Sequence, residues 1–132
     1  MSTVATFSRR LGLTVAADLP FWANEIQSAS STAKMDRWTL GLVDSATFMT
    51  YRSDAVQVLD IASAALAAGQ AEGKPVWLAV ETTDIGDSRL SYFGKPASKL
   101  AADLVTVQAG AQGHASFAGI AVHDSIGWPA LK

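Results

Sequence analysis

A chain of 132 residues, 49% of them hydrophobic, is long enough for one domain with its own core, spanning residues 1–132, and too apolar to be disordered. Its net charge of −2 excludes the basic surface that nucleic acid or an acidic membrane would attract, so neither is an expected partner. Because the chain has no cysteine, disulfides, thiolate metal sites and cysteine nucleophiles are excluded as well.

The N-terminal ten residues read as the end of a helix that closes at Leu11-Gly12. They lack the apolar core of a signal peptide, and no segment is long and apolar enough to predict a membrane span. We therefore expect a cytoplasmic protein, provided that the chain was not cut from a longer precursor.

Four short apolar segments without polar alternation predict parallel strands that are buried in a sheet. Each ends on or next to a residue able to do chemistry, namely Asp18, Tyr51, Glu81 and His123. In α/β folds the carboxyl ends of the strands are where ligands and catalytic groups gather. The segments are residues 13–18, 46–51, 74–82 and 117–123.

Helical patterns separate these strands and predict right-handed crossovers. The first, over residues 24–38, has poor helix propensity in its Ser-Ala-Ser-Ser-Thr run. The strongest, over residues 54–71, has Ser53 as its expected N-cap and Gly73 at its end. The third, over residues 96–112, follows a polar loop long enough to be functional or mobile.

The alternation along the strands distinguishes an open doubly wound sheet from half of a barrel. If Glu81 points to one face, Ala79 and Trp77 share that face, and the apolar residues between them face the helices. The other strands alternate in the same way, with one apolar face and one small or polar face. A doubly wound sheet needs two apolar faces, whereas a barrel lumen tolerates mixed side chains. The sequence therefore predicts an α/β fold, a (βα)4 half of a TIM barrel with four parallel strands and helices on one face.

Short motifs at the strand ends carry a resemblance to a known family. Phe48-Met-Thr-Tyr51 is similar to the Met-x-Tyr that ends strand six of chitinase-like barrels, and Asp18-Leu-Pro-Phe-Trp22 to the strand-five exit of such barrels. Glu81 ends the strand that corresponds to strand seven, where many retaining glycosidases carry their nucleophile. Trp128 follows the last strand, where these enzymes often place a sugar-stacking aromatic residue. On these motifs nearly the whole chain resembles the C-terminal half of a TIM-barrel glycoside hydrolase.

Two departures from that family concern the acid/base group. The family's acid/base carboxylate lies on a strand four that this chain lacks, and the chitinase Asp-x-x-Asp-x-Asp-x-Glu motif is absent.

A half barrel also leaves two strand edges and its lumen open, which favours association. We therefore expect a homodimer joined through the half-barrel edges, completing a (β/α)8 barrel. In the closed barrel, His123 and Asp124 of one copy would end the fourth strand, and Glu81 of the other copy would end the seventh. These are the two strands on which retaining glycosidases carry their carboxylates.

Glu81, His123 and Asp124 are the candidate catalytic residues. The resemblance implies that Glu81 is a nucleophile or the stabiliser of an oxocarbenium-like centre. An alternative of equal weight is that Glu81 is a solvated strand-end charge or forms a salt bridge to Arg52. His123 and Asp124 would be the proton-transfer group and its orienting partner. The simpler alternative is a histidine that is hydrogen-bonded to Tyr51.

Five residues are candidates for substrate binding. Asp18 and Arg52 offer charges at the strand ends, where Asp18 would bind substrate or pair with Arg52. Tyr51 would bind a substrate hydroxyl or pack at the pocket rim. Trp22 and Trp128 would stack on a sugar or lie at a dimer seam.

No histidine–carboxylate spacing matches a metal site, and no nucleotide-binding motif is present, so we expect neither a metal nor a cofactor. The expected function is that of a glycoside-hydrolase-like half barrel that binds or hydrolyses a carbohydrate at the carboxyl ends of its strands. The alternative is a non-catalytic homodimeric remnant that binds another small ligand or has only a structural role. An open-sheet interaction domain is a third possibility, and it would need helices on both faces.

Overall fold

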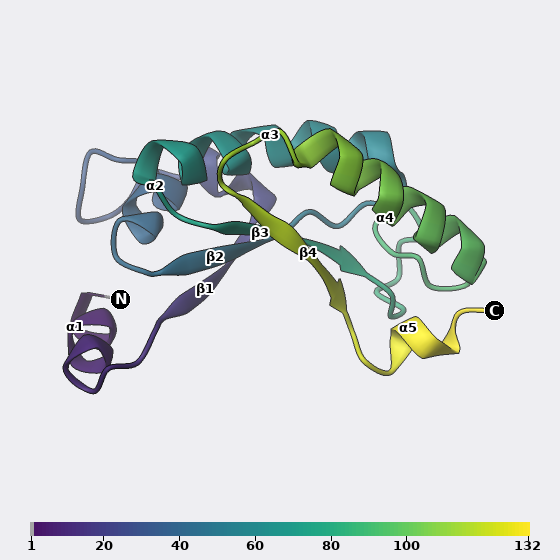
Figure 1. Cartoon of the computed structure of the whole chain (residues 1–132), viewed down its shortest axis with the longest axis horizontal. Helices are drawn as coiled ribbons and strands as arrows, with labels where there is room; N and C mark the ends of the chain where they lie inside the picture. The colour runs from purple at the N-terminus through teal and green to yellow at the C-terminus, as the bar shows by residue number, and fades with distance from the viewer. Residues whose placement is uncertain (1) are drawn as a thin grey trace.

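The structure is a computed structural model that describes residues 2–132. The protein is an α/β structure in which four strands form a single parallel sheet (Figure 1). The strands lie in the order β1-β2-β3-β4, so each strand pairs with the next one along the chain. The predicted parallel sheet is confirmed. The strands are β1 (Ala16–Pro20), β2 (Ser45–Met49), β3 (Val76–Glu81) and β4 (Phe117–His123).

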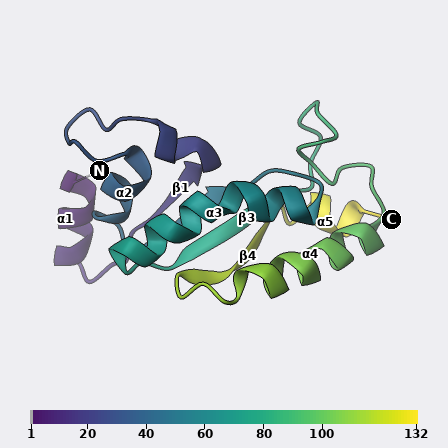
Figure 2. The ribbon, with the colours of Figure 1, turned by 90° about the horizontal axis from the view of Figure 1, so that it is seen from above.

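Three helices lie on one face of the sheet, as Figure 1 shows: α2 (Met35–Leu40), α3 (Ala55–Glu72) and α4 (Ala97–Ala111). Figure 2 shows α3 and α4 running side by side over the sheet. The remaining helices are α1 (Ser2–Arg10) before β1, the 3-10 helix η1 (Phe21–Glu25) after it, and α5 (Gly127–Ala130) after β4. No helix within residues 2–132 is both long and apolar enough to cross a membrane.

The predicted alternation is confirmed along β2 and at the start of β3, whereas β4 shows no alternating burial. The side chains of β2 and β3 that face the helices are fully buried: Ala46, Phe48, Val76, Leu78 and Val80. On the opposite face the register aligns Thr47, Trp77 and Gly119 across three strands. Trp77 lies on an inner strand yet is 40% exposed. That face of the sheet therefore has no helical layer in the part of the chain described here (Figure 1).

The first strand and the first crossover differ from the prediction. The strand begins at Ala16 rather than Leu13, whose side chain is exposed. The predicted helix over residues 24–38 is wrong, because η1 and α2 are separate and an irregular loop joins them. In that loop the Ser28 and Ser31 hydroxyls accept hydrogen bonds from backbone N–H groups two residues ahead. Such local bonds compete with helix formation and explain the break.

The ends of α3 follow from its flanking residues, with one correction. Asp54, not Ser53, is the N-cap, and its carboxylate accepts a hydrogen bond from Gln57 N at 3.1 Å. The Ser53 hydroxyl instead donates to Ser88 O at 2.9 Å and ties the loop after β3 to the helix start. Gly73 ends the helix with φ of +64°, the left-handed conformation that glycine adopts most easily, as predicted.

At Gly69, α3 packs tightly against the start of β3 and the turn before β4. A Cβ atom there would lie 2.9 Å from Ser116 Cβ and even closer to Val76 Cγ2. We expect Gly69→Ala to lower the free energy of unfolding by about 1–3 kcal/mol through overpacking, although alanine is the better helix former. Gly110→Ala is the matched control, because the three atoms nearest to its Cβ would all belong to the flexible side chain of Leu59. Urea denaturation compares the two variants, and equal stability would contradict this packing.

Candidate functional site

The carboxyl ends of β3 and β4 bring Glu81 and His123 together. The two residues are direct neighbours in the sheet register, and His123 Nδ1 lies 2.8 Å from Glu81 Oε2. The Glu81 side chain is 2% exposed, whereas the His123 side chain is 56% exposed. A buried carboxylate thus holds an imidazole ring that is open to solvent, and we call this unit the Glu81–His123 pair.

The other carboxylate oxygen of Glu81 accepts three more hydrogen bonds. Thr82 N, Thr83 N and Thr83 Oγ1 each lie 2.8 Å from Oε1. Burial alone raises the pKa of Glu81, but the N–H and hydroxyl of Thr83, and then His123, outweigh burial and bring the pKa below its ordinary value of 4.5. Glu81 is therefore ionised near neutral pH.

An ionised carboxylate only accepts hydrogen bonds, so the Nδ1 atom of His123 carries the proton that points to Glu81. In the neutral ring this tautomer leaves Nε2 free to accept a proton. A base with a buried orienting carboxylate is an arrangement that enzymes use for proton transfer. The geometry therefore favours His123 as the proton-transfer group.

The same contacts bear on the role expected of Glu81. A nucleophilic carboxylate needs an oxygen open to the anomeric carbon. Both Glu81 oxygens are engaged and the side chain is buried. The geometry thus favours a stabilising role for Glu81 over a nucleophilic one. No second copy is needed to bring Glu81 to His123, since both belong to one chain.

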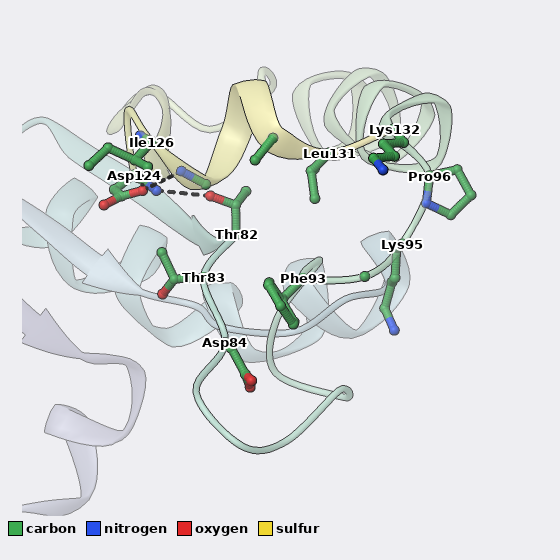
Figure 3. Close-up of a pocket in the computed structure, with 13 residues that line it drawn as sticks. Thr82, Thr83, Asp84, Phe93, Lys95, Pro96, Asp124, Ile126, Leu131 and Lys132 are labelled. Atoms are coloured by element: carbon green, nitrogen blue, oxygen red, sulfur yellow. Dashed lines mark hydrogen bonds between the residues drawn. The ribbon is translucent and has the colours of Figure 1, made fainter.

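Asp124 does not orient His123, which corrects the role predicted from its position. Its Oδ1 accepts hydrogen bonds from Ile126 N at 3.1 Å and Gly127 N at 2.7 Å (Figure 3). The bond from Gly127 is the main cause that lowers the pKa of Asp124. Its backbone N–H donates to Thr82 Oγ1, which itself donates to His123 O at 2.7 Å. Asp124 therefore shapes the turn from β4 into α5.

Tyr51 lies within electrostatic range of Glu81, whereas Asp18 lies further back on β1. Burial, and then the negative charges of Glu81 and Asp18, raise the pKa of the Tyr51 phenol, which therefore stays neutral. Asp18 is exposed on β1 and aligned with Thr47 of β2, so it lies on the sheet face without helices. Through Thr47, Asp18 is level with Trp77, four residues before Glu81 on β3. Asp18 therefore does not join Tyr51, Glu81 and His123 at the carboxyl end of this face.

Arg52 and the two tryptophans are placed differently from the expectation. The Arg52 guanidinium lies 4.9 Å from the ring centre of Phe21, and Nη1 donates to Tyr51 O at 2.7 Å. Arg52 therefore packs on an aromatic ring, and His123, not Arg52, is the partner of Glu81. Trp22 in η1 and Trp128 in α5 are exposed on separate elements.

The loop from β3 to α4 holds residues that sequence reasoning missed. Tyr92 is 1% exposed; its N–H donates to Glu81 O at 2.8 Å and its hydroxyl to Asp103 Oδ2 at 2.7 Å. Ser91 Oγ donates to Thr83 O at 2.6 Å. The loop is thus anchored to the strand that carries Glu81. The sequence signal for this anchoring was the pair of threonines directly after the strand-end carboxylate, because threonine hydroxyls often hydrogen-bond nearby acceptors.

No cluster of three or more histidine, aspartate and glutamate side chains in residues 2–132 is arranged to hold a metal ion. No protein-family model, curated protein or solved structure matches the chain. Function is therefore inferred from the geometry and chemistry of the site.

Proposed function

We propose that the chain is a (βα)4 half barrel that joins a second copy to close a (β/α)8 barrel. The consecutive strand order and the helices on one face support this architecture. Among the described residues, the outer edges of β1 and β4 have no strand partner. The exposed Trp77 leaves apolar surface open on the face that would line the lumen. A second copy supplies a matching edge for each free edge and covers this face.

We further propose that the site binds and hydrolyses a carbohydrate. The carrying observation is the buried, ionised Glu81 that holds the exposed ring of His123 at the carboxyl end of the sheet. The neutral Tyr51 phenol can donate to a sugar hydroxyl, and the exposed Asp18 carboxylate can accept from one. Trp22 and Trp128 offer exposed aromatic faces for stacking on a sugar ring.

Hydrolysis breaks the bond between the anomeric carbon and the leaving oxygen. Water supplies the oxygen that replaces it, and one proton passes from that water to the leaving oxygen. His123 carries this proton in our proposal, because Nε2 is its outward nitrogen. Glu81 stabilises the imidazolium that forms during the transfer, as a buried orienting carboxylate does.

A non-catalytic homodimeric barrel remnant that binds a small ligand is the second candidate. The hydrogen bonds of Glu81 favour it, because three of its four donors belong to the Thr82-Thr83 segment that starts the loop after β3. A carboxylate used in this way stabilises the fold without any catalysis.

Solution mass and a glycoside screen test the proposed function together. Light scattering should give twice the chain mass of 13.8 kDa. The dimer should then bind or cleave members of a panel of glycosides of glucose, galactose, xylose and N-acetylglucosamine. A mass that stays at one chain would overturn barrel closure by a second copy. A dimer that binds none of the sugars would overturn the proposed carbohydrate site. The non-catalytic homodimeric barrel would then be the remaining candidate.

A further inference from the structure

A cavity of about 670 Å³ opens just beyond the ends of β3 and β4, between the loop after β3 and the C-terminal turn (Figure 3). One wall is polar and comes from the ends of β3 and β4. The other wall comes from the loop and the C-terminal residues; it is mainly apolar but also carries Asp84, Lys95 and Lys132. The residues that matter are Thr82, Thr83 and Asp124 on the first wall, and Phe93, Ile126 and Leu131 on the second.

Hydrogen bonds hold both walls in place. Ala97 N donates to Lys132 O at 2.9 Å and fastens the chain end to the start of α4. Phe93 N donates to Ser91 Oγ at 3.0 Å, which fixes the loop. Asp124 N donates to Thr82 Oγ1 at 2.9 Å across the polar wall. The cavity is therefore preformed, as ligand sites usually are.

The free chemistry of the cavity is mainly apolar. The hydroxyl of Thr82 donates to His123 O and that of Thr83 to Glu81 Oε1, so neither has a proton left for a ligand. Phe93 and Ile126 are 53% and 79% exposed, and both line the cavity. Large apolar side chains around a preformed hollow favour an apolar ligand group, whereas a sugar ring needs free donors and acceptors.

The position of the cavity connects it to the proposed catalytic pair. Thr83 lines the cavity and donates to Glu81, and Asp124 lines it directly after His123. The cavity is therefore connected to the pair through Thr83 and Asp124, although neither Glu81 nor His123 lines it. The volume lies within the roughly 300–1,000 Å³ range of small-molecule sites and exceeds the needs of a single ring.

We propose that this cavity holds the apolar aglycone, an aryl or alkyl group, of the glycoside on which the Glu81–His123 pair acts. The inference rests on the proposed function and narrows its substrate class. A glycoside with an apolar leaving group should bind better than a glycoside of the same sugar with a small one.

The test compares p-nitrophenyl and methyl glycosides of each sugar in the panel by titration calorimetry. We expect the aryl compound to bind about 10- to 100-fold more tightly, from the apolar area that its ring buries. Phe93→Asp and Ile126→Asp, both at exposed positions, should bring this ratio toward one. Ile85→Asp is the matched control, since Ile85 is an exposed apolar residue of the same loop that does not line the cavity.

The outcomes separate the two proposals. A ratio near one in the unsubstituted protein, or a ratio that neither aspartate variant changes, would overturn the aglycone site while leaving the carbohydrate site in place. If no glycoside of either kind binds, the proposed function fails. Free p-nitrophenol then decides the cavity alone: binding that Phe93→Asp weakens supports an apolar site, and absence of binding overturns it.

Discussion

Replacing Tyr92 by alanine is expected to lower the free energy of unfolding by about 3–5 kcal/mol. Tyr92 is the largest of the fully buried side chains, and it lies in the core beneath the helices. Truncation removes the ring contacts and leaves a cavity, which costs more than the transfer of the ring to water alone. Urea denaturation followed by circular dichroism measures the loss.

Two further variants distinguish the contribution of the Tyr92 ring from that of its hydroxyl, and a buried ring from an exposed one. Tyr92→Phe keeps the ring but leaves Asp103 with only the Lys99 ammonium, 2.8 Å away, so the expected loss is about 1.5–3 kcal/mol. Phe93→Ala is the matched control, because this neighbour is mostly exposed and its truncation should change stability by less than about 0.5 kcal/mol. Equal losses for Tyr92→Ala and Phe93→Ala would contradict the burial of Tyr92.

The protonation state of Tyr92 strengthens this prediction. Burial, and then the Asp103 carboxylate, raise the pKa of the phenol well above its ordinary value of 10.0. The phenol therefore stays protonated and keeps donating to Asp103 through the neutral range. The stability difference between the parent chain and the Tyr92→Phe variant should accordingly not vary between about pH 6 and 9.

The class of fold was predictable from the strands because buried parallel strands leave a specific pattern. The apolar run around Leu78 suits a strand that has a neighbouring strand at each edge and a layer of helices on one face. Gly73 ends the helix that precedes this strand. The predicted bounds of the last strand, residues 117–123, match β4. In the crossover over residues 24–38, the poor helix propensity of the serine-rich run was the correct signal, because serine side chains there bond the backbone in place of a helix.

The members of the candidate site were predicted, but their pairing was not. Strand-end residues converge at one edge of any parallel sheet, which is why Glu81 and His123 were both singled out. Their direct contact depends on an irregularity between β3 and β4. Val76 aligns with Phe117 but Trp77 with Gly119, a shift of one residue. Without that shift Glu81 would align with Val122. Gly119, with φ of +147°, sits at the shift, and a glycine inside a strand is the signal of a bulge that the prediction did not use.

Replacing Glu81 by glutamine is expected to change both the pH dependence of stability and the proposed activity. The pH dependence follows from the pKa of the Glu81 carboxylate. Its pKa is below 4.5 in the folded chain and ordinary in the unfolded chain. The stabilisation is therefore complete above about pH 4.5 and is lost as the pH falls through the folded pKa, because the unfolded chain binds the proton first. Glu81→Gln cannot titrate, so its stability should fall less steeply between about pH 5 and 3. Asp87 and Asp124 also have lowered pKa values, so the difference between variant and parent is the quantity to read.

The proposed glycoside hydrolysis is the second readout of the Glu81 substitution. A glutamine oxygen can still accept from Thr82 and Thr83, so the fold should persist. Without the negative charge the imidazolium of His123 loses its stabilisation, and kcat/KM should fall by about 10²- to 10⁴-fold. His123→Gln should lose a similar factor. His114→Gln, at the exposed second histidine, is the matched control and should keep full activity.

The double variant of Glu81 and His123 then distinguishes a catalytic unit from two separate contributions. Residues that act as a unit are strongly non-additive, so the double variant should be no slower than the slower single variant. Multiplied losses would mean that Glu81 acts on the substrate independently of His123. If all three variants keep the activity and change only stability, the buried carboxylate serves the loop after β3. That outcome would identify the pair as a structural element of a binding protein.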